Sequence, residues 1–301
     1  MKTPIRTVTL VLASCLCRAV GATPIDYTVR LDPDLFGRLN QKDVTSCVKK
    51  PDDPSDFGKG CGPAAAVNSF AYLERRYPAI YGGGLIPSTG KNFTDEDLVR
   101  TAEDLARNFM GTDKDNGTFI YDFIGGKRKY IEGKRPGKTR YAAEVDPAKN
   151  LADDTKVTRP EDVVRKVPSW QFLHGNLKSE EDVEVLVNAV TLDADGKVTT
   201  IDTTVGHYIT AVMLEWIDVD LDDVIDKSEN AKLGYVDPVG GVLKSAGIFQ
   251  NSLNGPILSI GPTTGKTFGV TGVIKESPIP EPATLSLLVL ALAPLLGRLR
   301  T

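Results

Sequence analysis

The order of helical and strand patterns is the strongest constraint that the sequence places on its fold. Apolar spacing and strong helix formers predict helices in the first half, whereas alternating or continuous apolar runs predict strands in the second half. Helices followed by strands favour an α+β protein with an antiparallel sheet over an alternating parallel one. Helices are expected over 61–76, 94–108, 118–131 and 179–188, and strands over 207–214, 232–236, 248–260 and 267–274.

Composition narrows the class of protein further. The chain has 301 residues, of which 41% are hydrophobic and 25% are charged, as expected for a globular protein with a sizeable core. The net charge is −4 and there is no internal basic run, so we expect no nucleic-acid partner. The chain has only two histidines, which excludes a histidine-rich metal site.

The N-terminal segment 1–22 has the three parts of a secretory signal peptide. A basic start with Lys2 and Arg6 precedes an apolar stretch, and small residues follow at Val20-Gly21-Ala22. The apolar stretch is too short to cross a bilayer. An alternative is lipoprotein processing at Leu12-Ala13-Ser14-Cys15, which would leave Cys15 lipidated.

The C-terminal segment 278–301 is patterned as well. Pro280-Glu281-Pro282 precedes a short apolar run, and Arg298 and Arg300 follow it. In this order the parts resemble the PEP-CTERM sorting signal of exported bacterial proteins. The resemblance implies a short transmembrane helix, an exosortase-type enzyme as partner, and delivery to the cell envelope, outer surface or extracellular matrix of a bacterium.

Between these ends, residues 23–277 are predicted to form the functional domain. They carry 31 basic and 39 acidic side chains, because five of the 36 basic residues and one of the 40 acidic residues lie in the two ends. The net charge of the domain is therefore −8. Two cysteines, Cys47 and Cys61, and both histidines remain in it.

Three residues of the domain have the chemistry of a cysteine nucleophile site. Cys61 begins a predicted helix, whose positive dipole end stabilises a thiolate. His207 lies at the start of one predicted strand and Asp237 at the end of the next. In an antiparallel pair these ends can lie together, so that the carboxylate orients the imidazole.

The residues around these positions resemble signature blocks of papain-like cysteine peptidases of the bacteriocin-processing (double-glycine) type. The matching segments are Gly60-Cys61-Gly62-Pro63-Ala64-Ala65, Gly206-His207-Tyr208-Ile209 and Tyr235-Val236-Asp237-Pro238. The resemblance implies a papain-like fold with an N-terminal nucleophile helix followed by an antiparallel sheet. It implies that Cys61 is the nucleophile, His207 the general base and acid, and Asp237 the orienting residue.

The same family places an oxyanion-binding glutamine a few residues before the cysteine. Here the nearest upstream glutamine is Gln41, 20 positions away. Either the Pro/Asp-rich stretch between them is an insertion that loops out, or the oxyanion site is incomplete.

Two alternatives concern the other cysteine and the other histidine. A disulfide between Cys47 and Cys61 would remove the nucleophile and leave an inactive binding or matrix protein on the same fold. His174 is the alternative base, although its apolar neighbours favour a packed or surface position.

An acidic segment between His207 and Asp237 resembles an EF-hand calcium loop. Counting Asp218 as position 1, acids occupy positions 3, 5, 9 and 12, but Asp223 replaces the glycine of position 6. The predicted calcium ligands are Asp218, Asp220, Asp222, Asp226 and Glu229. A solvated acidic loop is the alternative, and the predicted chemistry requires no cofactor.

The sequence as a whole predicts an exported cysteine peptidase, or amide-bond transferase, that acts on a peptide or protein substrate. Its partners would be that substrate, the sorting enzyme and, before processing, the membrane through the C-terminal helix.

Overall fold

The protein has an α+β fold, as the order of sequence patterns predicts. The computed structural model describes residues 23–53, 56, 58–88, 90, 92–147, 162–260 and 267–279. The predicted leader and the tripeptide and apolar run of the predicted sorting signal lie outside these residues. Within the described ranges, no helix combines the length and apolar character needed to cross a membrane.

Five α-helices are present among the described residues. The bounds are Cys61–Arg76 for α1, Pro78–Tyr81 for α2, Asp95–Asp104 for α3, Ile120–Lys134 for α4 and Trp170–Lys178 for α5. The predicted start of α1 at its cysteine is confirmed. At the start of α3, Thr94 and Asp97 form a reciprocal capping box. A π-helical turn, Leu105–Phe109, extends α3.

Nine strands form one sheet, and β1 (Ile25–Asp26) pairs with β7 (Ile217–Asp218) in a separate ribbon. The order across the sheet is β10-β9-β8-β6-β5-β11-β3-β4, with β2 added beside β6. All pairs are antiparallel except β3–β4. The bounds are Val29–Arg30 (β2), Thr139–Val145 (β3), Val163–Arg165 (β4), Asp182–Leu192 (β5), Val198–Glu215 (β6), Lys232–Asp237 (β8), Val242–Phe249 (β9), Leu258–Ile260 (β10) and Thr267–Pro278 (β11).

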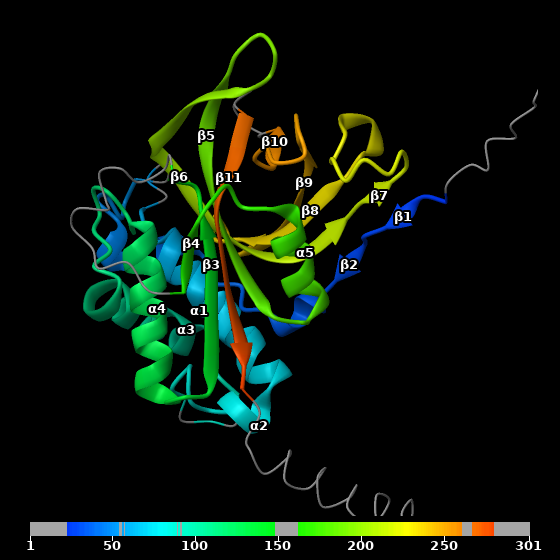
Figure 1. Ribbon diagram of the computed structural model, residues 1–301. Helices are drawn as coiled ribbons and strands as arrows, with labels where there is room; N and C mark the ends of the chain where they lie inside the picture. The colour runs from blue at the N-terminus through cyan, green and yellow to red at the C-terminus, as the bar shows by residue number, and fades with distance from the viewer. Residues whose placement is uncertain are drawn as a thin grey trace, which may run out of the picture.

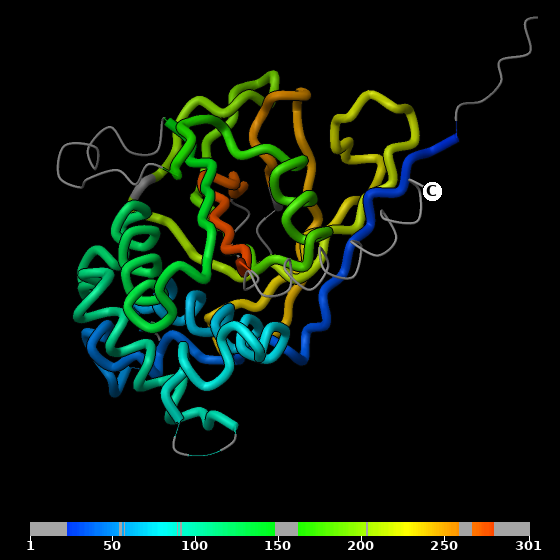
Figure 2. The backbone as a smooth tube through the Cα atoms, turned by 60° about the horizontal axis from the view of Figure 1, so that its bottom comes forward, coloured from blue at the N-terminus to red at the C-terminus, as the bar shows by residue number. Residues whose placement is uncertain are grey.

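The sheet closes on itself through β10, a strand of 3 residues. Strand β10 pairs with β9 on one side and with β11 on the other. Strands β5, β6, β8, β9, β10 and β11 therefore form a closed ring, which removes the free edges that an open sheet would expose. Both views place helices α1, α3 and α4 together beside this ring, with α5 apart from them (Figures 1 and 2).

Four predictions about local structure are wrong. The strand expected over 248–260 is not continuous, because β9 ends at Phe249 and β10 begins at Leu258. Residues 179–188 do not form a helix, because α5 ends at Lys178 and strand β5 begins at Asp182. Valines at 183, 185 and 187 recur at every second position and favour a strand, a period that the helix prediction overlooked; Asp182 and Glu184 next to them are buried as well. Strand β6 begins at Val198, so His207 lies within it rather than at its start. Strand β3 lies between 132 and 160, where no strand is among those expected from the sequence.

Helix α1 is the central helix of the molecule. Every residue from Gly62 to Glu74 is buried, although the sequence of the helix is only weakly amphipathic. Three consecutive small residues, Ala64 to Ala66, allow the helix to approach strand β6 closely. The contact includes a hydrogen bond from Thr210 Oγ1 of β6 to the Ala65 carbonyl oxygen, 3.1 Å long. The first turn of α1 is thereby held against β6.

A buried asparagine joins α1 to the segment that precedes it. The Asn68 side chain is fully buried, and its Oδ1 accepts a 2.7 Å hydrogen bond from the Leu39 backbone N–H. The Asn68 carbonyl oxygen accepts a second bond, from the Gly37 N–H at 2.9 Å. These bonds fix the backbone of residues 37–39 relative to the helix.

We expect Asn68→Ala to lower the free energy of unfolding by about 1–3 kcal/mol, because the Leu39 N–H would lose its partner inside the protein. Urea denaturation measures this change. The exposed Asn254→Ala serves as the matched control and should change stability by less than about 0.5 kcal/mol. Equal effects of the two substitutions would contradict the structural role of Asn68.

Candidate active site

The sulfur of Cys61 lies at the N-terminus of α1. Gly60 precedes the helix and offers no side-chain cap, so the first turn keeps its unpaired N–H groups. The backbone N–H groups of Gly62 and Tyr208 hydrogen-bond to the Cys61 sulfur. A negative charge on the sulfur is thus stabilised by two amides and by the positive end of the helix dipole.

An imidazole and a carboxylate complete the arrangement. His207 Nε2 and Asp237 Oδ1 are 2.8 Å apart, and the His207 side chain also hydrogen-bonds to Cys61. Because Nε2 faces the carboxylate, Nδ1 is the ring nitrogen left for the sulfur. The antiparallel pairing of β6 with β8 brings the two strands into register, with Thr210 opposite Val236. His207 and Asp237 therefore lie where the sheet extends past the end of β8.

Two further groups hold the carboxylate of Asp237. The backbone N–H of Val239 donates to Oδ1 at 2.8 Å, and Lys244 Nζ donates to Oδ2 at 2.7 Å. Lys244 lies on strand β9, next to β8, and sequence reasoning did not identify it. The sequence places Lys244 one hairpin away from Asp237, but many surface lysines lie at such positions and have no part in a site.

The charges of the three groups depend on one another. Burial alone would raise the pKa of the Cys61 thiol, but its bond to His207 and the charge of that ring lower the pKa below its usual value. Burial would lower the pKa of His207, but hydrogen bonds to Asp237 and Cys61 raise it to about 9. Burial opposes ionisation of Asp237 as well, yet His207 and Lys244 lower its pKa to about 2. The shifts therefore favour the pair of a thiolate and an imidazolium over the pair of a thiol and a neutral imidazole, beside an ionised Asp237.

Gln41 lies at the same site in spite of its distance along the sequence. It begins a 3₁₀ turn, Gln41–Asp43, and its backbone N–H donates to the Pro238 carbonyl oxygen at 2.8 Å, next to Asp237. Its side chain is only 4% exposed, and Nε2 donates to the Gly58 carbonyl oxygen at 3.1 Å. The segment between Gln41 and Gly60 leaves the site and returns to it.

Two glycines around the cysteine are required by close contacts. A Cβ at Gly60 would lie 2.9 Å from the Gln41 carbonyl oxygen, and a Cβ at Gly62 would lie 2.6 Å from Thr118 Oγ1. Any larger side chain at Gly60 would therefore push Gln41 away from Cys61.

A cavity of about 250 Å³ opens onto the sulfur. Its wall combines the catalytic candidates with a turn that precedes α4 and with residues of β5 and β6. The lining residues are Gln41, Gly58, Lys59, Cys61, Asn116, Gly117, Thr118, Phe119, Ile120, Leu186, Thr204, Gly206, His207 and Tyr208. Gln41, Cys61 and His207 line the cavity, whereas Asp237 does not and lies on the other side of the imidazole.

The other cysteine and the other histidine have different surroundings. Cys47 is fully buried, and burial raises the pKa of its thiol. Both Cys47 and Cys61 are free thiols in this structure. His174 belongs to α5, and its ring lies against the rings of Tyr27 and Trp170 at centroid distances of 5.5 and 6.1 Å. Burial lowers the pKa of His174. The imidazole that contacts Cys61 is therefore that of His207.

The acidic loop brings together three of its five predicted calcium ligands. Carboxylate oxygens of Asp218, Asp220 and Asp222 lie within 4.8 Å of one another. Burial first, and then repulsion from Asp222, raises the pKa of Asp220. The carboxylate of Glu229 instead accepts bonds from the Trp216 indole N–H and from two backbone N–H groups, and Asp226 caps the 3₁₀ turn Lys227–Glu229.

The backbone of this loop also bears on the EF-hand resemblance. Asp223, at position 6, has a φ of +58°. An EF-hand uses glycine at this position for its sharp turn, and aspartate is one of the few other residues that adopt left-handed backbone readily. The missing glycine therefore does not prevent the turn. Strand β7 precedes the loop, where an EF-hand has a helix.

Comparisons with known proteins add no relative. No family model matches the chain, and no curated protein matches it.

The ion pair predicts a reactive Cys61 at pH values where ordinary thiols are inert. Its alkylation by iodoacetamide should persist below the usual thiol pKa and decline only as the pH falls through the lowered pKa. We expect His207→Ala to slow this reaction at about pH 7 by about tenfold or more, since each unit of restored pKa lowers the thiolate fraction tenfold.

His174→Ala is the matched control and should leave the alkylation rate unchanged, while Cys47 should stay unmodified in the folded protein. Peptide mapping after timed alkylation measures all three. An unchanged rate at Cys61 in His207→Ala would contradict the ion pair.

Proposed function

We propose that the protein is a papain-like cysteine peptidase, or an amide-bond transferase of the same mechanism. The observation that carries the proposal is the chain of contacts from Cys61 to His207 to Asp237, with a 2.8 Å bond between the last two. It is supported by a nucleophile at the N-terminus of a buried helix, followed in the chain by a sheet that holds the imidazole and the carboxylate.

In this mechanism the Cys61 thiolate attacks a peptide carbonyl carbon, and the S–C bond forms as negative charge develops on the carbonyl oxygen. The His207 imidazolium then gives its proton to the leaving amine, and the C–N bond breaks. The neutral imidazole takes a proton from water, or from an acceptor amine, and the acyl group leaves Cys61. Asp237 keeps the imidazole oriented throughout, and Lys244 keeps Asp237 ionised.

Gln41 is proposed to donate to the developing oxyanion. Its amide is buried and lines the cavity beside Cys61. A buried neutral amide suits this task because it stabilises negative charge without adding a cation next to the imidazolium. The close contact between Gly60 and the Gln41 carbonyl oxygen fixes the position of this residue relative to the sulfur.

We further propose export and surface sorting, on the basis of segments 1–22 and 278–301. A peptidase of this kind would act on peptides outside the cytoplasm, after the leader has directed it there.

Gln41→Ala should lower kcat/KM for peptide hydrolysis about a hundredfold or more, which is the typical cost of losing one oxyanion donor. Cys61→Ser should abolish hydrolysis. A peptide library digested by the purified protein, followed by mass spectrometry of the products, measures both effects.

Gln171→Ala, an exposed glutamine on α5, is the matched control and should retain full activity. Hydrolysis that survives in Cys61→Ser would exclude the proposed peptidase mechanism. An inactive protein in which Cys61 is bonded to Cys47 would instead support a binding or matrix role.

We also propose that the acidic loop binds calcium through Asp218, Asp220 and Asp222, since carboxylate oxygens are the ligands that calcium prefers. Added calcium should then raise the melting temperature, and Asp220→Ala should abolish the rise. Asp195→Ala, in the exposed β5–β6 turn, is the control and should preserve it. An equal rise in both variants would exclude the site.

A further inference from the structure

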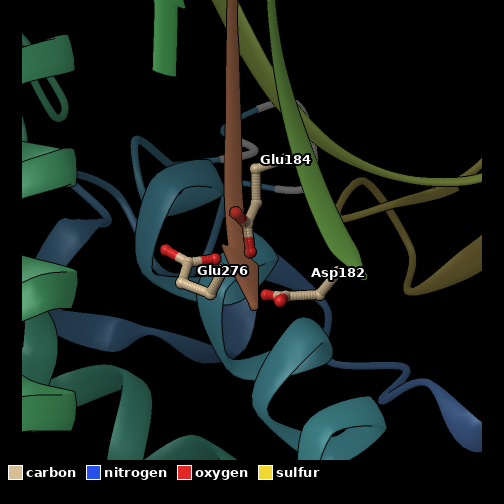
Figure 3. A group of neighbouring side chains, drawn as sticks. All are labelled: Asp182, Glu184 and Glu276. Atoms are coloured by element: carbon tan, nitrogen blue, oxygen red, sulfur yellow. The ribbon is translucent and has the colours of Figure 1, made fainter. Parts of the chain in front are cut away.

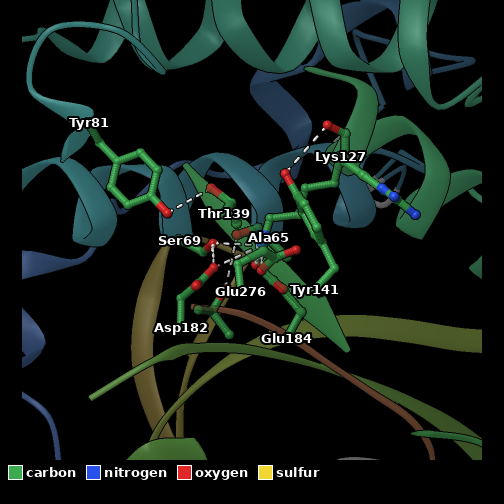
Figure 4. A network of polar contacts seen from close by, with 11 residues as sticks. Ala65, Ser69, Tyr81, Lys127, Thr139, Tyr141, Asp182, Glu184 and Glu276 are labelled. Atoms are coloured by element: carbon green, nitrogen blue, oxygen red, sulfur yellow. Dashed lines mark hydrogen bonds and ion pairs between the residues drawn. The ribbon is translucent and has the colours of Figure 1, made fainter. Parts of the chain in front are cut away.

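A second cluster of reactive groups lies inside the protein and has no part in the proposed peptidase mechanism. The ammonium group of Lys127, on α4, is enclosed by three carboxyl groups, with none of the four side chains more than 1% exposed. Asp182 and Glu184 come from β5 and Glu276 comes from β11 (Figure 3). Figure 4 shows these side chains converging beneath α1.

The contacts centre on the Lys127 ammonium. Lys127 Nζ lies 2.9 Å from Asp182 Oδ2, and the Ser69 hydroxyl donates to the same oxygen at 2.5 Å. Lys127 Nζ also donates to Ser69 Oγ at 3.0 Å, to Glu184 Oε1 and to Glu276 Oε2. The ammonium occupies the space between the carboxyl groups, so it takes the place that a metal ion would need.

The cluster holds more acid groups than one cation can balance. Three carboxylates and one ammonium would leave two uncompensated negative charges in a dry interior, where such charges are strongly unfavourable. Burial, together with the neighbouring acids, raises the pKa of Glu184 to about 7 and raises that of Glu276 well above its usual value. The same carboxyl groups outweigh the effect of burial and raise the pKa of Lys127 well above its usual value, so the ammonium is its resting form and must pass a proton to a carboxylate before the nitrogen can react.

We propose that Lys127 Nζ and Asp182 Cγ condense within the folded protein to form an amide cross-link between α4 and β5. The geometry brings the two groups together: Lys127 Nζ lies 2.9 Å from Asp182 Oδ2, with two further carboxyl groups as proton carriers, and all four side chains are buried away from water. Glu276 is hydrogen-bonded to Asp182 and contacts Lys127, so it can carry protons from the nitrogen to the leaving oxygen.

The reaction balances without an external reagent. Lys127 passes one proton to a neighbouring carboxylate, and the resulting amine attacks Asp182 Cγ to form the N–C bond. The Cγ–Oδ2 bond breaks, and Oδ2 leaves as water with two protons that both originate from the ammonium. One ammonium and one carboxylate thus become one amide and one water, and Glu276 ends in its initial state.

The cross-link would join residues that are 55 positions apart in the sequence. It would restrict the unfolded chain as a disulfide does, without depending on the redox conditions that disulfides need.

The test is the mass of the full chain, purified folded and then denatured with reductant, so that no disulfide contributes. Peptide mapping establishes the chain ends. The cross-linked protein should be lighter than its sequence mass by one water, about 18 Da, and digestion should yield one peptide pair joined through Lys127 and Asp182. The unlinked mass in the folded wild-type protein would overturn the proposal.

Asp182→Asn provides a matched variant, because an amide acceptor would release ammonia instead of water. This variant should lose about 17 Da and yield the same joined peptide pair as the wild type. Glu276→Gln removes the proposed proton carrier and should leave mostly unlinked protein. Glu181→Gln, at the partly buried position just before β5, should leave the cross-link intact. A peptide pair joined through Glu184 or Glu276 would overturn the assignment to Asp182.

Discussion

Close packing of α1 against strand β6 is the constraint on which the rest of the structure depends. The small residues at the start of α1 and the bond from Thr210 to Ala65 hold the helix N-terminus against the strand. Cys61 and His207 come from these two elements, so their contact follows directly from the packing. The closed ring of strands then makes β6 a fixed support, because β5 and β8 pair with it on both sides.

Much of the fold could be predicted from the sequence, and the failures have physical causes. The start of α1, the capping box of α3 and the antiparallel pairing of β6 with β8 follow from local patterns. The helix predicted over 179–188 is wrong because the valines at 183, 185 and 187 follow the two-residue period of a strand; what the sequence could not indicate is that Asp182 and Glu184 are buried. Their partner Lys127 is too distant in sequence for any local pattern to indicate it.

The residues of the candidate site, too, could be predicted only in part. Cys61, His207 and Asp237 are expected together because each has recognisable neighbours and is predicted to lie at a helix or strand end. Cys61 and Asp237 do lie at such ends, whereas His207 lies inside β6. Lys244 was missed because a lysine on a strand carries no local signal. The position of Gln41 could not be decided, since 20 residues of irregular chain can either loop out or carry it away. Its carbonyl contact with Gly60 and its bond to Pro238 resolve that choice.

The central claim is that Cys61 is a working nucleophile activated by His207. Pre-steady-state reaction with p-nitrophenyl acetate tests it most directly, because an acyl-enzyme forms before it is hydrolysed. The structure predicts a burst of about one equivalent of nitrophenol per chain, with the acetyl group located on Cys61 by mass spectrometry and no burst in Cys61→Ser or His207→Ala. A burst that persists in Cys61→Ser, or a folded and reduced wild-type protein that shows none, would contradict the claim.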